Sequence, residues 1–100
     1  MADVRMMGPL AFRDFTLEGT CQENRGHTHN YDHVTFVQAG AVMVFYQPDG
    51  AAEERQSRIY RVGDFFLVKA DMYHRIKALA PHTRYVCVFA HRDHEGLVAE

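Results

Sequence analysis

A length of 100 residues allows one domain with a modest core and leaves no room for a second catalytic domain. A hydrophobic fraction of 47% with a charged fraction of 24% is that of a folded globule, so intrinsic disorder is not expected. A net charge of −2 argues against a nucleic-acid partner, and no apolar run approaches the roughly 20 residues of a membrane-spanning helix.

Short segments rich in β-branched and aromatic residues dominate the chain. Residues 1–8 are expected to form a flexible or exchanged arm. Strands are predicted from the apolar and alternating runs, in chain order, at residues 34–37, 42–46, 59–62, 65–68, 73–77 and 84–90. Strands this short, spaced by roughly 8–12 residues, are typical of an all-β sandwich or barrel. We therefore expect one all-β domain over residues 1–100.

Turn residues separate the predicted strands. Pro48-Asp49-Gly50 combines a residue that presets φ with one that tolerates a positive φ, which predicts a turn. The polar stretch 51–57 is expected to be a hairpin loop or a short edge strand, and Gly63-Asp64 marks the next turn. Because no window of about 11 residues has a helical period, the tail at 92–100 is expected to fray or to form a single helical turn.

Histidine is over-represented, with seven in the chain. His27 and His29 are two residues apart, and in a strand such residues point to the same face. His33 follows after a short bend, and His74 lies in a later predicted strand, so in a closed barrel all four imidazoles can converge on one interior point. Imidazole is the commonest side-chain ligand of borderline divalent metals. The four histidines therefore predict one metal site.

Two segments around these histidines resemble the motifs of the cupin superfamily. The first motif is HxH, three or four residues, usually Glu, six residues and then Gly, which the chain matches from His27 to Gly40 with HTHNYDHVTFVQAG. The second leads from Gly-Asp through a short strand and Pro-x-Gly to His, which the chain matches from Gly63 to His74 with GDFFLVKADMYH. The resemblance implies a single-domain cupin-type double-stranded β-helix, or jelly-roll barrel.

The chain departs from these motifs at positions that matter for the site. His33 stands where the first motif usually has Glu, which resembles a four-histidine subset of small cupins. Lys69 and Asp71 replace the Pro and the Gly of the second motif, so that turn must be built differently. Four neutral histidines add no charge, so a divalent ion would keep its full charge and favour an anionic ligand.

The nitrogen ligands and the resemblance together define a class of function. An all-nitrogen set argues against Mg and Ca, and leaves Zn, Fe, Mn, Ni and Cu open. The resemblance implies a metal-dependent enzyme that acts on a small organic acid, a diketone or a similar anionic substrate, by dioxygenase-like, isomerase or lyase chemistry. No general base can be named. A non-catalytic ligand or metal sensor, and an inert structural barrel, stay open as alternatives.

Several residues are candidates for the substrate pocket. Arg25 shares the strand face of His27 and can bind a carboxylate, although an exposed position before the strand explains it equally well. Tyr46 and Tyr85 can line a pocket with a polar tip, or can be core aromatics. Candidate apolar walls are Phe66, Val68, Ile76 and Phe89. A register error of one residue would reverse these assignments.

The remaining residues bear on compartment and assembly. Two cysteines, Cys21 and Cys87, are too few for a disulfide framework, and no signal peptide is evident, so a reduced cytoplasmic protein without membrane partners is expected. The pair His91 and His94 is expected on the surface, as is His82.

Apolar residues on the outer faces of the predicted sheets need to be covered, and the resemblance implies a homodimer formed by sheet packing. Those residues are Val34, Phe36, Met43 and Phe45.

Overall fold

The computed structural model describes residues 3–27, 32–47, 56–70 and 72–90, without the side chains of residues 3, 25, 27 and 56. Nine strands form within these residues: β1 (Asp3–Met7), β2 (Leu10–Leu17), β3 (Glu23–His27), β4 (His33–Ala39), β5 (Ala41–Gln47), β6 (Gln56–Arg61), β7 (Phe65–Val68), β8 (Tyr73–Ala78) and β9 (Thr83–Ala90). Among the described residues no helix is long and apolar enough to span a membrane. The predicted turn at 48–50, the stretch up to residue 55 and the tail at 92–100 lie outside the description.

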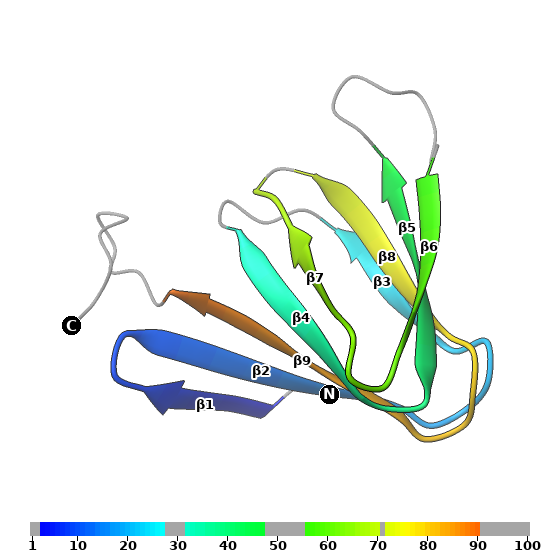
Figure 1. Cartoon of the computed structure of the whole chain (residues 1–100), viewed down its shortest axis with the longest axis horizontal. Helices are drawn as coiled ribbons and strands as arrows, with labels where there is room; N and C mark the ends of the chain where they lie inside the picture. The colour runs from blue at the N-terminus through cyan, green and yellow to red at the C-terminus, as the bar shows by residue number, and fades with distance from the viewer. Residues whose placement is uncertain (1–2, 28–31, 48–55, 71, 91–100) are drawn as a thin grey trace.

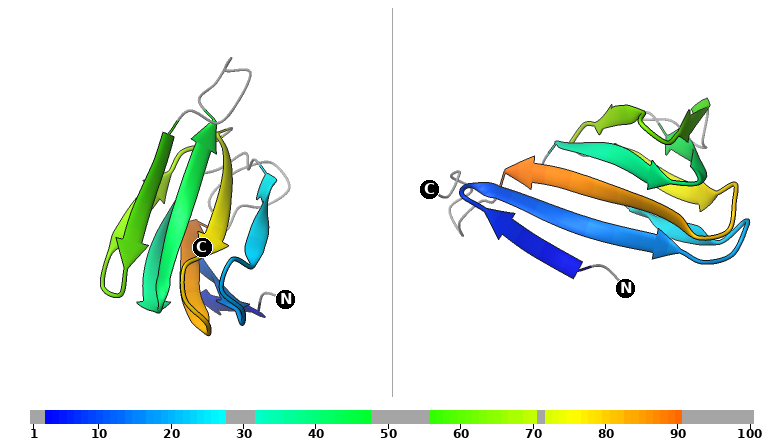
Figure 2. Two further views of the ribbon diagram at one scale, coloured as in Figure 1. Left: turned by 90° about the vertical axis from the view of Figure 1, so that its right-hand side faces the viewer. Right: turned by 60° about the horizontal axis from the view of Figure 1, so that its bottom comes forward.

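Two antiparallel sheets face each other (Figures 1 and 2). Sheet A has the order β1-β2-β9-β4-β7, and sheet B has the order β3-β8-β5-β6. The β2–β3, β4–β5 and β8–β9 connections gather at one end of the barrel, at the lower right of Figure 1. The end of β3 and the starts of β4 and β8 therefore meet at the opposite end, which we call the mouth.

The core lies between the sheets, where alternate residues of each strand point inward. Burial alternates without exception along β5 and β8, so each strand turns one side chain in two to the core. The buried apolar residues that form one cluster are Leu17, Val37, Val42, Val44, Tyr46, Phe66, Val68, Ile76, Ala78, Tyr85 and Cys87. The all-β barrel expected from the strand pattern is confirmed, and the walls predicted at Phe66, Val68 and Ile76 are buried, while Phe89 is partly buried.

The N-terminal arm contains a strand. Within residues 1–8, β1 pairs antiparallel with β2 of the same chain. Arg5 Nε donates to Asp14 Oδ2 across this pair at 2.8 Å. Exchange of the arm needs a second copy of the chain, so it stays a prediction.

Candidate metal site

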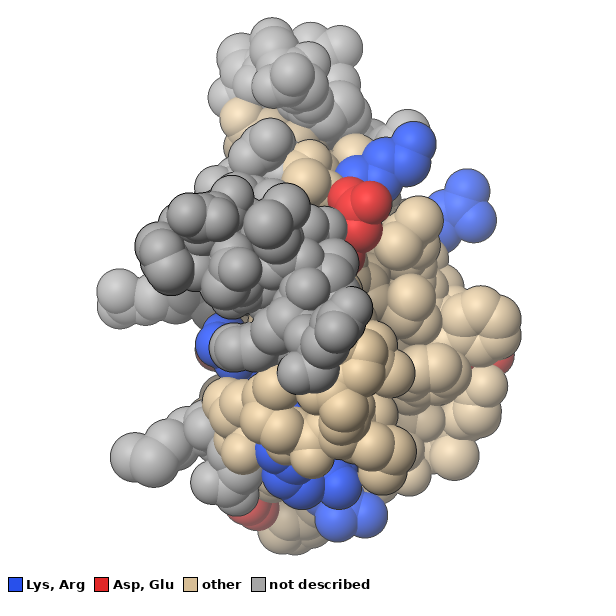
Figure 3. Space-filling model, turned by 90° about the vertical axis from the view of Figure 1, so that its left-hand side faces the viewer, with Lys and Arg blue, Asp and Glu red and all other residues tan. Residues whose placement is uncertain are grey.

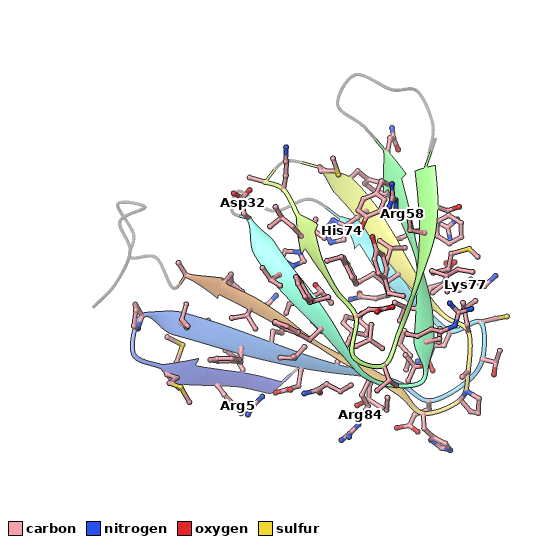
Figure 4. All side chains as sticks on the ribbon, viewed as in Figure 1. Arg5, Asp32, Arg58, His74, Lys77 and Arg84 are labelled. Atoms are coloured by element: carbon pink, nitrogen blue, oxygen red, sulfur yellow. The ribbon has the colours of Figure 1, made fainter. Side chains whose placement is uncertain are left out.

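His33 and His74 come from opposite sheets and meet inside the mouth of the barrel. His33 begins β4, and His74 is the second residue of β8. Their side chains are almost fully buried, with 2% and 1% of their surface exposed. The two ring centroids lie 5.4 Å apart, and Figure 4 shows His74 in the space between the sheets. Two residues 41 positions apart in the sequence thus come together at the point that the two motifs predict.

The ring orientation of His74 is set by the backbone. Its Nδ1 lies 3.1 Å from the carbonyl oxygen of Met72. Because a carbonyl can only accept, Nδ1 carries the hydrogen, and in the neutral ring the lone pair is then on Nε2. Histidines that bind metals commonly donate their second ring hydrogen in this way, which fixes the ring and the ligating nitrogen.

The imidazole of His33 contacts a neighbouring side chain through its Nδ1. Its Nδ1 lies 3.2 Å from Thr35 Oγ1, and that oxygen lies 3.3 Å from Cys87 Sγ. Thr35 is fully buried, so this chain of three groups lies within the core. With Nδ1 engaged, Nε2 is the nitrogen of His33 that could bind a metal, as it is in His74.

Cys87 is a buried thiol rather than a reactive one. Burial raises its pKa to about 11, although the hydrogen bond with Thr35 and the charge of Arg13 lower it in part. At neutral pH the group is therefore protonated, and a protonated thiol is a poor nucleophile and a poor metal ligand. Cys87 is thus a small residue of the core cluster. Cys21 is exposed and also free.

The structure describes only the backbone of His27 and none of His29, the other two predicted ligands. His27 ends β3, and its Cα is paired in register with that of His74, but its side chain is not described. His29 falls within residues 28–31, outside the described residues, as do His91 and His94. No group of three metal-ligating side chains occurs among the described residues. The two rings that are described, with Nδ1 held on both, fit a metal ligand set.

The tyrosines that the sequence offered as pocket residues have different surroundings. Tyr85 is fully buried, stacks on Phe15 at 5.0 Å between ring centroids, and accepts a hydrogen bond from Asn24 Nδ2 at 2.9 Å. Burial and a hydrogen bond with Tyr60 hold the pKa of Tyr46 above its usual range, against the opposing charge of Arg58. Tyr85 is thus a core residue, whereas the hydroxyl of Tyr46 meets polar groups.

A pocket of about 230 Å³ opens beside the histidines, where the edges of the two sheets meet. It is lined by Tyr46, Arg58, Tyr60, Leu67, Lys69 and Met72. Tyr46 is paired in register with His74, so the pocket shares a wall with the histidine site. The carboxylate of Asp32 accepts from the Ala70 amide at 2.6 Å, which ties the connection after β7 to the start of β4.

Sequence reasoning missed Arg58 and instead offered Arg25, whose side chain lies outside the description. A signal for Arg58 was present. Residues 56, 58 and 60 alternate with 57, 59 and 61, so Arg58 shares its face with Tyr60 rather than with Ile59. The signal was weak because both faces of this strand carry polar residues.

Comparison with known proteins identifies the fold. No family model matches the chain, and no curated protein matches its sequence. Solved structures do match. KdgF from a Halomonas species superposes with a TM-score of 0.75 at 20% identity, over 96% of this chain and 83% of that one.

Two further structures agree with this match. An RmlC-like cupin family protein with a double-stranded β-helix fold, from Methanocaldococcus jannaschii, gives a TM-score of 0.70 at 12% identity, over 90% of this chain and 80% of that one. An oxalate decarboxylase variant from Bacillus subtilis gives 0.74 at 14% identity, over 98% of this chain and 30% of that one. The chain therefore has the double-stranded β-helix fold of the cupins, as its two motifs predicted.

Proposed function

We propose that the chain binds one divalent transition metal at the mouth of the barrel, through His27, His29, His33 and His74, and acts on a small anionic substrate. The observation that carries the proposal is the meeting of His33 and His74, two buried imidazoles 5.4 Å apart that are both held at Nδ1. A buried polar ring needs a reason to be there, because its desolvation costs free energy. Joint ligation of a metal would supply that reason.

The chemistry expected of the site follows from its ligands. A bound Zn, Fe, Mn, Ni or Cu ion would supply Lewis acidity, or redox chemistry where the metal allows it. The chain itself would hold each ligand ring at Nδ1 and exclude water with buried apolar neighbours such as Val68 and Ile76. Dioxygenase-like, isomerase and lyase reactions remain the candidate classes. The structural match to an oxalate decarboxylase supports a small organic acid as the substrate class.

A second candidate is a non-catalytic binding protein. The described residues that line the pocket include no carboxylate and no histidine, so none of them is an evident general base. Binding of a small anion or of the metal itself, without turnover, would need no such group. The function would then be that of a ligand or metal sensor.

Elemental analysis of the untreated protein, followed by activity assays, tests the proposal. We expect about one transition-metal ion per chain, and strong loss of metal in His74→Ala. The matched control is His82→Ala, because His82 is an exposed turn residue whose Nδ1 lies 2.8 Å from Glu18 Oε2. Equal metal content in both variants would show that His74 is not a ligand.

The same metal-loaded protein separates the enzyme from the sensor. Fe-, Mn- and Zn-loaded samples would be assayed in air against β-dicarbonyls, catechols and keto acids. Turnover with any of them supports the enzyme. A filled site that gives ligand binding but no turnover supports the sensor instead.

We also propose that the protein is a homodimer that buries the outer face of sheet A. By register, the exposed apolar residues on this face are Met7, Leu10, Phe36, Phe65 and Leu67. A groove of about 510 Å³ crosses the face between β1 and β4, and Figure 3 shows broad uncharged surface with charged side chains in small separate groups. An apolar surface of this kind is typical of an interaction site.

Sheet B offers less apolar surface. On its outer side the Arg75 guanidinium lies 3.9 Å from the ring centroid of Phe45, so the chain covers that ring itself. Phe36→Asp is therefore expected to give a monomer by light scattering, while Ile59→Asp on sheet B should not change the mass. The two side chains are a matched pair, at 40% and 43% exposure. A wild-type mass of one chain would contradict the dimer.

A further inference from the structure

Arg58 lies on the barrel-side face of β6, an edge strand, and its side chain is exposed at the mouth. It is paired in register with Val44, and Val44 is fully buried in the core. Directly opposed residues of an antiparallel pair share a face, so the guanidinium of Arg58 is on the barrel side of β6. Figure 4 agrees, since Arg58 lies on the same side of β6 as His74, whereas Lys77 is on the outside. The exposed guanidinium is therefore accessible to a ligand at the mouth.

The side chains that line the pocket around Arg58 include groups of the kinds that bind anions. Lys69 adds a second cation to its lining, and Tyr46 and Tyr60 add hydroxyl groups. Among the described residues neither Arg58 nor Lys69 forms an ion pair; the ion pairs there join Arg5 to Asp14, Arg75 to Glu23 and His82 to Glu18. Two cations without a carboxylate in the described lining create a positive site within a chain whose net charge is −2.

The pocket is small, and one of its walls is rigid. About 230 Å³ is room for about seven water molecules at roughly 30 Å³ each, which suits a compact organic ion rather than a polymer. The Tyr60 ring stacks on buried Phe66 with centroids 4.3 Å apart. Its hydroxyl is therefore presented from a fixed ring, which lowers the entropy lost when a ligand binds.

The pocket also adjoins the histidine site. Tyr46 lies beside His74 in the strand register, and Met72, whose carbonyl accepts from His74, lines the pocket as well. The pocket therefore lies beside the strand position of His74, although neither imidazole lines it.

We propose that Arg58 and Lys69 bind a carboxylate of a small organic acid at the mouth of the barrel, with the hydroxyl of Tyr60 as a further hydrogen-bonding group. A guanidinium can bind a carboxylate through two parallel hydrogen bonds, which gives orientation as well as affinity. The other end of the acid then faces the histidines, and in this respect alone the inference rests on the proposed function. Arg58 would thus select acids over neutral compounds of the same shape.

Calorimetric titration with malonate, and with malonamide as its uncharged analogue, tests the inference. Wild-type protein is expected to bind malonate and not malonamide. Arg58→Gln should weaken malonate binding about ten-fold or more, because a charge-assisted pair is lost. The matched control is Arg61→Gln on the same strand, whose register partner Ala41 places it on the outer face, and its affinity should stay within about two-fold of wild type.

The outcomes separate this inference from the proposed function. Equal malonate affinity in wild type and Arg58→Gln, equal binding of malonate and malonamide, or no malonate binding by wild type would each overturn it. So would unchanged malonate affinity combined with a larger mass of Arg58→Gln by light scattering, since inward charges on edge strands can serve to block edge association.

Metal content is measured on the same samples. If the protein holds no metal and none can be loaded, the proposed function fails. Malonate binding that depends on Arg58 in that protein would still support the anion site. If metal is bound normally and malonate binding does not depend on Arg58, only the anion site fails.

Discussion

Among the glycines whose surroundings the structure describes, Gly40, between β4 and β5, is the one where an added methyl group should damage the barrel most. Its φ is +72°, in the left-handed region, where a residue with a Cβ is strained by about 1–2 kcal/mol. A Cβ built there would also overlap Thr83 Oγ1 and lie 3.0 Å from Thr83 Cα. Gly40→Ala must therefore distort either the turn or the start of β9.

The cost can be estimated from what Thr83 does. Its side chain is fully buried, and its Oγ1 donates to the carbonyl of Ala80 at 2.8 Å. Overpacking of a filled site typically costs about 1–3 kcal/mol, and loss of one buried hydrogen bond costs about 1 kcal/mol. With the backbone strain of about 1–2 kcal/mol, we expect Gly40→Ala to lower the free energy of unfolding by about 3–6 kcal/mol, a large share of a small domain's stability.

Urea unfolding followed by far-ultraviolet circular dichroism measures this loss, with Gly63→Ala as the control. Gly63 has a φ of +91°, but a Cβ there meets nothing within 4 Å, so only the backbone strain of about 1–2 kcal/mol is expected. Repeating Gly40→Ala in a Thr83→Ala background should recover about 1 kcal/mol or more, because the overlapping hydroxyl is gone. A cost no larger than that of Gly63→Ala would refute the packing argument.

Three further predictions concern the chain of groups behind His33. Thr35→Val should lower metal affinity about ten-fold in competition with a chelator, because Nδ1 of His33 loses its partner, and unchanged affinity would exclude a positioning role for Thr35. A thiol reagent at pH 8 should label Cys21 at once and Cys87 only in denaturant, and two fast thiols would contradict the burial. Because burial raises the pKa of Cys87 from 9.0 to about 11, its contribution to stability is complete below pH 9 and is lost as the pH rises through 11. Cys87→Ala should therefore flatten the fall in unfolding free energy across that range, and identical slopes in urea titrations at pH 8 to 11 would contradict it.

Most strands were predictable because each has one buried face. The predicted run 65–68 coincides with β7, and 73–77 differs from β8 by one residue. The strand β2 escaped prediction because each of its faces mixes apolar and charged residues, with Phe12 and Asp14 on one face and Ala11 and Arg13 on the other. Alternation is the signal of a strand with one apolar and one polar face, so it fades where both faces are mixed.

The histidine positions were predictable for a different reason. Of the predicted ligands within the described residues, each lies at the end or near the start of a strand, and the order of strands brings those ends together at the mouth. His33 begins β4, and His74 lies in β8 beside the end of β3. The spacing of a short motif is enough to specify this, because strand period and turn position are both local properties.

The anion pocket could not be found in the same way, because no local pattern defines it. Its two cations come from β6 and from the residue after β7, which are edge strands of different sheets. The barrel-side position of Arg58 depends on its register with Val44, and a slip of one residue would turn it to the outer face of the sheet. Candidate metal ligands within short motifs can therefore be proposed from sequence. The residues proposed here to select a substrate cannot, because their meeting depends on which edge strands the fold brings together.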